Sequence, residues 1–99
     1  MYYTFTCEDV ENSLELRQAN RPVHMERLNA LLSEGRLLLA GANPAIDNPD
    51  PGPAGFTGSL IIAEFDCLED AQAWADAEPF LLAGVYKSIT VKPFRKALP

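Results

Sequence analysis

The chain has 99 residues, which fits one domain and leaves no room for a second. Its formal net charge of −6 at pH 7 excludes the basic surface that nucleic acids and anionic membranes require, so we expect neither as a partner. With 47% hydrophobic residues, the composition is that of a folded domain and not of a disordered segment.

Alternating aromatic and small residues at the N-terminus predict the first strand. The alternation runs from Tyr2 to Cys7 and places Tyr3, Phe5 and Cys7 on one face. The charged stretch from Glu8 to Asn12 ends this strand.

The segment from Ser13 to Glu34 is predicted to be helical with one interruption. A first piece ends near Ala19, Asn20 caps a second piece, and Pro22 falls in its first turn, where the missing N–H costs nothing. The second piece has the i, i+4, i+7, i+8 spacing of an amphipathic helix, carried by His24, Leu28, Leu31 and Leu32. We therefore expect His24 to face the protein interior.

Two apolar runs in the middle of the chain predict the second and third strands, Leu37–Ala40 and Gly58–Phe65. Both runs are apolar on their two sides, so both faces of the sheet should be covered. Between them, residues 42–57 hold four of the eight prolines and several turn dipeptides. An irregular segment of this length is expected to be a lid, a binding loop or an interface arm, or else a tolerated surface insertion.

The second helical region is predicted to begin with a capping box, in which Asp66 is the N-cap and Glu69 the third helical residue. This helix is expected to stop near Ala77. Glu78 and Pro79 then begin a further short helical turn, because an acidic residue before proline is typical of a helix start.

The last predicted strand is Val85–Phe94, with Val85, Ile89 and Val91 on one face and Tyr86, Ser88 and Thr90 on the other. The resulting order is β-α-β-β-α-β. Short connections and right-handed crossovers turn this order into a ferredoxin-like α+β fold over residues 1–99, a four-stranded antiparallel sheet with both helices on one face. The uncovered face would leave apolar side chains in water, so we expect a homodimer through the sheet face.

The two cysteines and the single histidine do not form a metal-binding pattern. Cys7 and Cys67 lie sixty positions apart with no CxxC pair, so a dedicated zinc site would lack ligands. We expect both cysteines to be reduced, partly buried residues. No signal peptide and no membrane-spanning apolar stretch is visible, so a soluble cytoplasmic protein is expected.

Several distinct short motifs are spread along the whole chain. They are Arg21-Pro22-Val23-His24, Gly35 to Gly41, Gly55 to Ser59, Ile62 to Asp66, Ala71 to Ala77, Pro79-Phe80, Ala83 to Tyr86 and Val91 to Phe94. Together these motifs resemble the YciI-like family. The resemblance implies a dimeric α+β barrel of the muconolactone-isomerase-like superfamily, with an active site in a cleft by the sheet.

The same resemblance implies a histidine–carboxylate pair. The family's functional signal is a histidine on the first long helix and an aspartate in a DPF or DPY motif after the second helix. His24 matches the histidine, whereas Glu78, in Glu-Pro-Phe, stands where the family usually has aspartate. The carboxylate role therefore falls to Glu78, whose side chain is one methylene longer, or passes to Asp76.

A histidine paired with a carboxylate can act as a general base near neutral pH. The carboxylate holds one ring nitrogen and stabilises the imidazolium, while the other nitrogen takes a proton from the substrate. The alternatives are that His24 is a core histidine bridging helix and sheet, and that Glu78 is only a helix cap.

Three further residues are candidates for binding a substrate. Arg21 could orient an anionic group by its charge, and Ser59 and Tyr86 could orient a carbonyl by their hydroxyls, although each also fits a surface or strand position. The leading hypothesis is a small enzyme without cofactor or metal that performs isomerase, lyase or hydrolase chemistry on a small molecule. The alternative is a dimeric module that binds a small ligand without turning it over.

Overall fold

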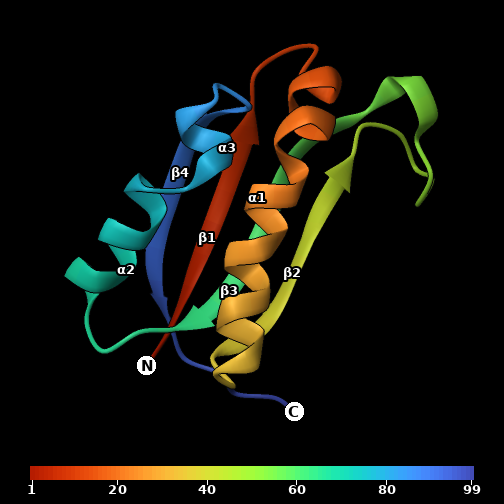
Figure 1. The fold of residues 1–99 in the computed structure, drawn as a ribbon. Helices are drawn as coiled ribbons and strands as arrows, with labels where there is room; N and C mark the ends of the chain where they lie inside the picture. Colours follow the sequence, from red (N-terminus) through yellow and green to blue (C-terminus); the bar gives the residue numbers. More distant parts are fainter.

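The computed structural model describes residues 1–99 and has the predicted element order (Figure 1). The strands and helices are β1 (Tyr2–Asp9), α1 (Leu14–Ser33), β2 (Leu37–Pro44), the 3-10 turn η1 (Gly52–Ala54), β3 (Phe56–Glu64), α2 (Leu68–Asp76), α3 (Pro79–Leu82) and β4 (Tyr86–Phe94). The four strands form one antiparallel sheet in the order β2-β3-β1-β4, and the helices lie over one face of it (Figure 1). This confirms the ferredoxin-like α+β fold.

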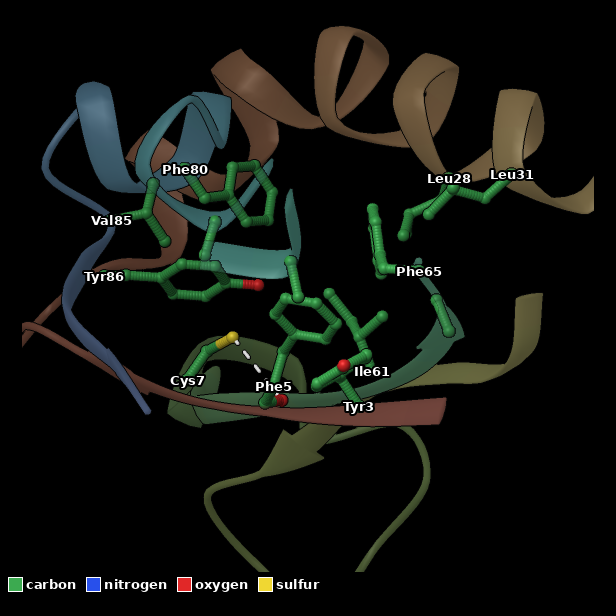
Figure 2. Packing of buried hydrophobic residues seen from close by; sticks show 13 residues of the cluster. Tyr3, Phe5, Cys7, Leu28, Leu31, Ile61, Phe65, Phe80, Val85 and Tyr86 are labelled. Atoms are coloured by element: carbon green, nitrogen blue, oxygen red, sulfur yellow. Dashed lines mark hydrogen bonds between the residues drawn. The ribbon is translucent and has the colours of Figure 1, made fainter. Parts of the chain in front are cut away.

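The hydrophobic core lies between the helices and the face of the sheet toward them, which we call the inner face. Figure 2 shows the inward aromatic and aliphatic side chains of this cluster, with Phe5 of β1 at its centre. Phe5, Ile61 and Phe80 are almost completely buried, and the expected inward face of β1 is confirmed. None of the helices combines the length and the apolar composition needed to span a membrane.

The expected break in the first helix is wrong, because α1 runs without interruption from Leu14 to Ser33 with Pro22 inside it. Asn20 does not cap a new helix; its side-chain amide donates to the carbonyl of Leu16, 2.9 Å away. The buried residues of α1 form one stripe, Arg17, His24, Leu28 and Leu31, which continues across the proline. Packing of this stripe outweighs the one backbone hydrogen bond that an exposed proline removes.

The expected capping box of the second helix is also wrong. The N-cap of α2 is Cys67, and no side chain caps the helix. Because α2 begins one residue later than predicted, Asp66 lies outside the helix and Glu69 is its second residue, so the box spacing is lost. The short turn after α2 is confirmed as α3, and Glu78 is its N-cap.

The last strand differs from its predicted alternation at its first residue. Tyr86 is buried on the inner face, whereas Ser88, predicted to share its face, is exposed. The pairing of β4 with β1 shifts between Glu8 and Asp9, so that Asp9 pairs with Tyr86 and Glu8 with Ser88. The extra residue in β4, Lys87, reverses the alternation and turns Tyr86 inward, as a β-bulge does.

The hairpin between the second and third strands is longer than predicted. β2 continues to Pro44 and β3 begins at Phe56, so the connecting segment is shorter than the expected 42–57 and contains η1. The hairpin extends beyond the body of the sheet in Figure 1. The expected coverage of both strand faces is not met within one chain, because Leu39 and Leu60 are 45% and 38% exposed on the outer face.

One glycine is required by the close approach of two strands. A Cβ added to Gly58 of β3 would lie 2.1 Å from the carbonyl oxygen of Cys7, in the paired strand β1. No atom could occupy that position without displacing the backbone. Gly41 of β2, by contrast, has nothing within 4 Å of an added Cβ.

We predict that Gly58→Ala lowers the free energy of unfolding by at least about 2 kcal/mol, because the new methyl group forces β3 away from β1. Gly41→Ala, the control in the neighbouring strand, should change it by less than about 1 kcal/mol. Urea denaturation followed by circular dichroism measures both. Equal effects of the two substitutions would contradict the close approach.

Candidate active site

A cavity of about 540 Å³ lies between α1 and the part of the sheet formed by β2 and β3. Most of its wall is apolar, with Leu28 and Ile61 on opposite sides. Its polar lining residues are Arg17, Gln18, Arg21, His24, Asn29 and Ser59. Concave, largely apolar sites with a few polar groups are typical of small-molecule binding, and their usual volumes of about 300–1,000 Å³ include this one.

His24 of α1 contacts the carboxylate of Glu78, the residue just before α3. The ring nitrogen Nδ1 is 2.5 Å from Glu78 Oε1, and both side chains are buried. The imidazole stacks on the ring of Phe80 at a centroid distance of 3.9 Å, which fixes its plane. Nε2 has no protein partner, is not enclosed, and belongs to a residue that lines the cavity. One nitrogen is therefore held and the other is open to a ligand.

Glu78 is completely buried, and its two oxygens have three partners. Oε1 also accepts the backbone N–H of Phe80 at 3.1 Å, which is the N-cap bond of α3. Oε2 accepts from Arg27 Nη1 at 3.4 Å. Arg27 itself donates to the carbonyl of Trp74 and lies over its ring, 4.5 Å from the centroid. Glu78 thus has both roles that the sequence left as alternatives, a helix cap and the partner of the histidine.

A second buried ion pair, which the sequence reasoning missed, joins Arg17 of α1 to Asp9 of β1. Arg17 Nε and Nη2 donate to the two oxygens of Asp9 at 2.6 and 3.1 Å. Ser13 Oγ donates to the same carboxylate at 2.6 Å. A signal was present: Arg17 lies seven residues before His24, so the two residues share one face of an unbroken helix. The predicted interruption hid it.

Ser59 and Tyr86, two of the predicted binding residues, are brought together beside Arg17. Tyr86 O–H donates to Ser59 Oγ at 2.8 Å, and Arg17 Nη2 donates to the same oxygen at 2.8 Å. Burial raises the pKa of the Tyr86 phenol, so it remains a protonated donor. Burial also raises the pKa of the neighbouring Cys7 thiol to about 12, so this cysteine (Figure 2) is no nucleophile near neutral pH.

The other two predicted site residues lie differently. Arg21 is exposed on α1 and lines the cavity. Asp76 is not brought to His24; it is exposed at the end of α2 and accepts from Gln72 at 2.9 Å. The carboxylate beside the histidine is that of Glu78. No group of three or more His, Cys, Asp or Glu side chains comes together in a way that could hold a metal ion.

Residues 1–95 match the family model of the YCII-related domain. The chain therefore belongs to the YCII-related family, which confirms the resemblance found in its motifs.

Individual relatives match nearly end to end. Protein YciI of Escherichia coli O6:H1 and Protein YciI of Shigella flexneri are each 57% identical over 96 residues, which cover 97% of this chain and 98% of theirs. An uncharacterized protein of Haemophilus influenzae is 51% identical over the same share of each chain.

Among solved structures, 5-chloro-2-hydroxyhydroquinone dehydrochlorinase (TftG) of Burkholderia phenoliruptrix AC1100, in complex with 2,5-dihydroxybenzoquinone, superposes with a TM-score of 0.83. The alignment covers 96% of this chain and 94% of the dehydrochlorinase, with 21% sequence identity. This likeness shows that the two proteins share the fold.

We predict that the neutral ring of His24 carries its proton on Nδ1, because this nitrogen donates to Glu78. Nitrogen-15 NMR of the imidazole at about pH 8, above the usual titration range of histidine, reports the tautomer directly. Glu78→Ala removes the acceptor and should abolish the preference. A native protein with its proton on Nε2 would show that Glu78 does not orient the ring.

Proposed function

We propose that the protein is a small enzyme that performs acid–base chemistry on a small molecule in the cavity beside α1. His24 is the general base and Glu78 the carboxylate that orients it. The observation that carries the proposal is the asymmetry of the buried imidazole, since Nδ1 is bonded to a carboxylate and Nε2 is open at the cavity. A histidine held through one nitrogen and unbonded at the other can exchange a proton with a ligand while its ring stays in place.

The chemistry follows from this asymmetry. With the proton on Nδ1, the lone pair of Nε2 is directed away from Glu78 and can accept a proton from a substrate C–H or O–H. The imidazolium that forms is stabilised by the buried Glu78 carboxylate. Stacking on Phe80 and the bond to Glu78 hold the ring in place, so little reorganisation is needed when the proton moves.

The reaction type that fits best is proton abstraction next to a carbonyl, with or without loss of a leaving group. Apolar walls exclude water from the base and favour a small cyclic or aromatic substrate. The shared fold with a dehydrochlorinase that was solved in complex with a benzoquinone supports this class of small-molecule chemistry. The family resemblance of the motif around His24 implies an active site at this residue.

The proposal can be tested without knowing the natural substrate. A panel of cyclic ketones, lactones and hydroxyquinols in D₂O is followed by proton NMR, because a general base exchanges an acidic C–H for deuterium even when no product accumulates. His24→Ala should lower the exchange rate by about 100-fold or more, the usual contribution of general-base catalysis. Glu78→Gln should lower it as well, and Glu64→Gln, an exposed glutamate on β3, is the control that should not.

Two outcomes of the panel would count against catalysis. Exchange that survives His24→Ala in a folded protein would remove His24 from the reaction. Ligands that bind in the cavity but are never exchanged or converted by the native protein would identify a small-ligand-binding module instead of an enzyme.

We further propose that the protein forms a homodimer through the outer face of its sheet. Leu39 of β2 and Leu60 of β3 lie on this face and are partly exposed, although both side chains are large and apolar. A second copy of the chain would cover them, since a two-fold interface places the same patch on both subunits. The family resemblance implies the same arrangement.

We predict a sedimenting species of twice 10.9 kDa for the native protein at micromolar concentration. Leu60→Glu should shift it to the monomer, because it places a charge in the buried interface. Leu82→Glu, on α3 and 73% exposed, is the matched control and should leave the dimer intact. Analytical ultracentrifugation measures all three, and a native protein found only at 10.9 kDa would contradict the proposal.

A further inference from the structure

We infer that the cavity takes an organic anion with a planar ring and oxygen-borne charge, such as an aromatic carboxylate or a phenolate, and that Arg17 is its anchor. This inference deepens the proposed function, on which it rests for the position of the reacting site, by naming the class of its substrate. Four features of the cavity carry it: the absence of carboxylates, a free guanidinium nitrogen, a free hydroxyl hydrogen and an aromatic wall.

The first feature is the distribution of charge. The chain has 14 acidic and 8 basic residues, yet no Asp or Glu lines the cavity, whereas Arg17 and Arg21 both do. Asp9 neutralises Arg17, but Arg21 has no carboxylate within ion-pair distance. The charged side chains that line the cavity are therefore basic only, which favours anions over cations.

The second feature is the unused donor of Arg17. Its Nε and Nη2 are bonded to Asp9, and Nη2 also donates to the carbonyl of Gly58 at 2.9 Å and to Ser59. Nη1 has no partner in the protein and is not enclosed. Because three groups hold the rest of the guanidinium, Nη1 is a pre-oriented N–H donor at the cavity, which is the group that recognises carboxylate and phenolate oxygens.

The third feature is the hydroxyl of Ser59. Its oxygen already accepts from Tyr86 and from Arg17, each at 2.8 Å, and its own hydrogen enters no hydrogen bond within the protein. Ser59 lines the cavity, so this hydrogen is a second donor next to Arg17. Two adjacent donors that lack acceptors are suited to a ligand that brings acceptors only, as an ionised oxygen does.

The fourth feature explains why the ligand has a ring. Phe56 and Phe80 lie beside the guanidinium of Arg17, each with its ring centroid 5.2 Å from Cζ, and both line the cavity. Inorganic phosphate could use the donors but would leave the half-buried Phe56 and the aliphatic part of the cavity wall in contact with water. An aromatic or quinoid ring would cover this wall, which contributes to affinity in proportion to the buried apolar surface.

The positions of the Arg17 and Ser59 donors also connect anion binding with the proposed proton transfer to His24. Phe80 contacts both Arg17 and His24, so the anion-binding group and the base are on neighbouring parts of one wall. A carbonyl oxygen held by Arg17 and Ser59 takes up the electron pair of the C–H bond that His24 breaks at the adjacent carbon, and it then becomes the enolate or phenolate oxygen that these donors bind most strongly. This arrangement fits a substrate that carries an oxygen substituent next to the reacting C–H.

The test compares two probes of nearly equal shape, benzoate and benzamide, by isothermal titration calorimetry of the full chain. Benzoate should bind at least about tenfold more tightly than benzamide, since a charge-assisted hydrogen bond contributes more than a neutral one. Inorganic phosphate should bind more weakly than benzoate. The difference between benzoate and benzamide should shrink at high salt, as expected for the exposed Arg21.

Variants assign the effect to residues. Arg17→Gln combined with Asp9→Asn, which leaves no unpaired buried charge, should remove the preference for benzoate. If that double variant does not fold, Ser59→Ala and Arg21→Gln provide the same test, each with a smaller loss of the preference. Lys87→Gln, a charge-matched control 60% exposed on β4, should bind benzoate as the native protein does.

The outcomes separate this inference from the proposed function. Equal affinities for benzoate and benzamide in the native protein, or a preference that survives every cavity variant, would overturn the anionic class even if His24-dependent exchange is found. Conversely, His24→Ala should still bind benzoate within about threefold, because Arg17 and Ser59 supply the donors. Benzoate binding that persists while no exchange is ever detected would leave the ligand class standing and remove the catalysis.

Discussion

The structure depends on the burial of two carboxylates. Asp9, on the sheet, and Glu78, before α3, are both removed from water, and each is paired with basic side chains of α1. A buried carboxylate without partners would cost several kcal/mol, so α1 can lie on the sheet only with Arg17 and His24 turned inward. The bonds from these two carboxylates to α1 therefore set the rotation of the helix about its axis, which apolar contacts alone specify less strictly. The same rotation places an arginine and a histidine at one cavity.

Much of the fold could be predicted because its signals are local. Alternation in β1, the apolar runs of β2 and β3, and the turn before α3 all depend on neighbouring residues. The predictions were wrong where contacts between residues far apart in the sequence determine the local structure. Pro22 is accommodated because the buried stripe of α1 is held by the sheet, and Tyr86 turns inward because the pairing with Asp9 shifts by one residue. Neither fact is visible in a window of sequence.

The residues of the candidate site also differ in how far the sequence alone predicts them. His24 could be predicted from its position on a helical stripe and from family motifs, and Glu78 from the motif that follows α2. For Arg17 the spacing from His24 indicates only a shared helix face, because its role comes from Asp9 and Ser59, which are 8 and 42 positions away in the chain. A charged residue on a helix is usually exposed, so sequence alone favours a solvated Arg17. Only the fold shows that it is buried and that one nitrogen is free.

The cap of α3 has a consequence for how this family can vary. The oxygen of Glu78 that accepts from His24 also accepts the amide of Phe80, and the ring of Phe80 is the surface on which His24 stacks. One acidic side chain thus starts a helix, aligns a base and places the aromatic ring beneath it. An exchange between glutamate and aspartate at this position cannot be an isolated change, because a difference of one methylene moves all three groups relative to one another. Relatives with a different acidic residue at this position are therefore expected to differ also at the residues that pack around α3. Substitutions at these positions should be correlated.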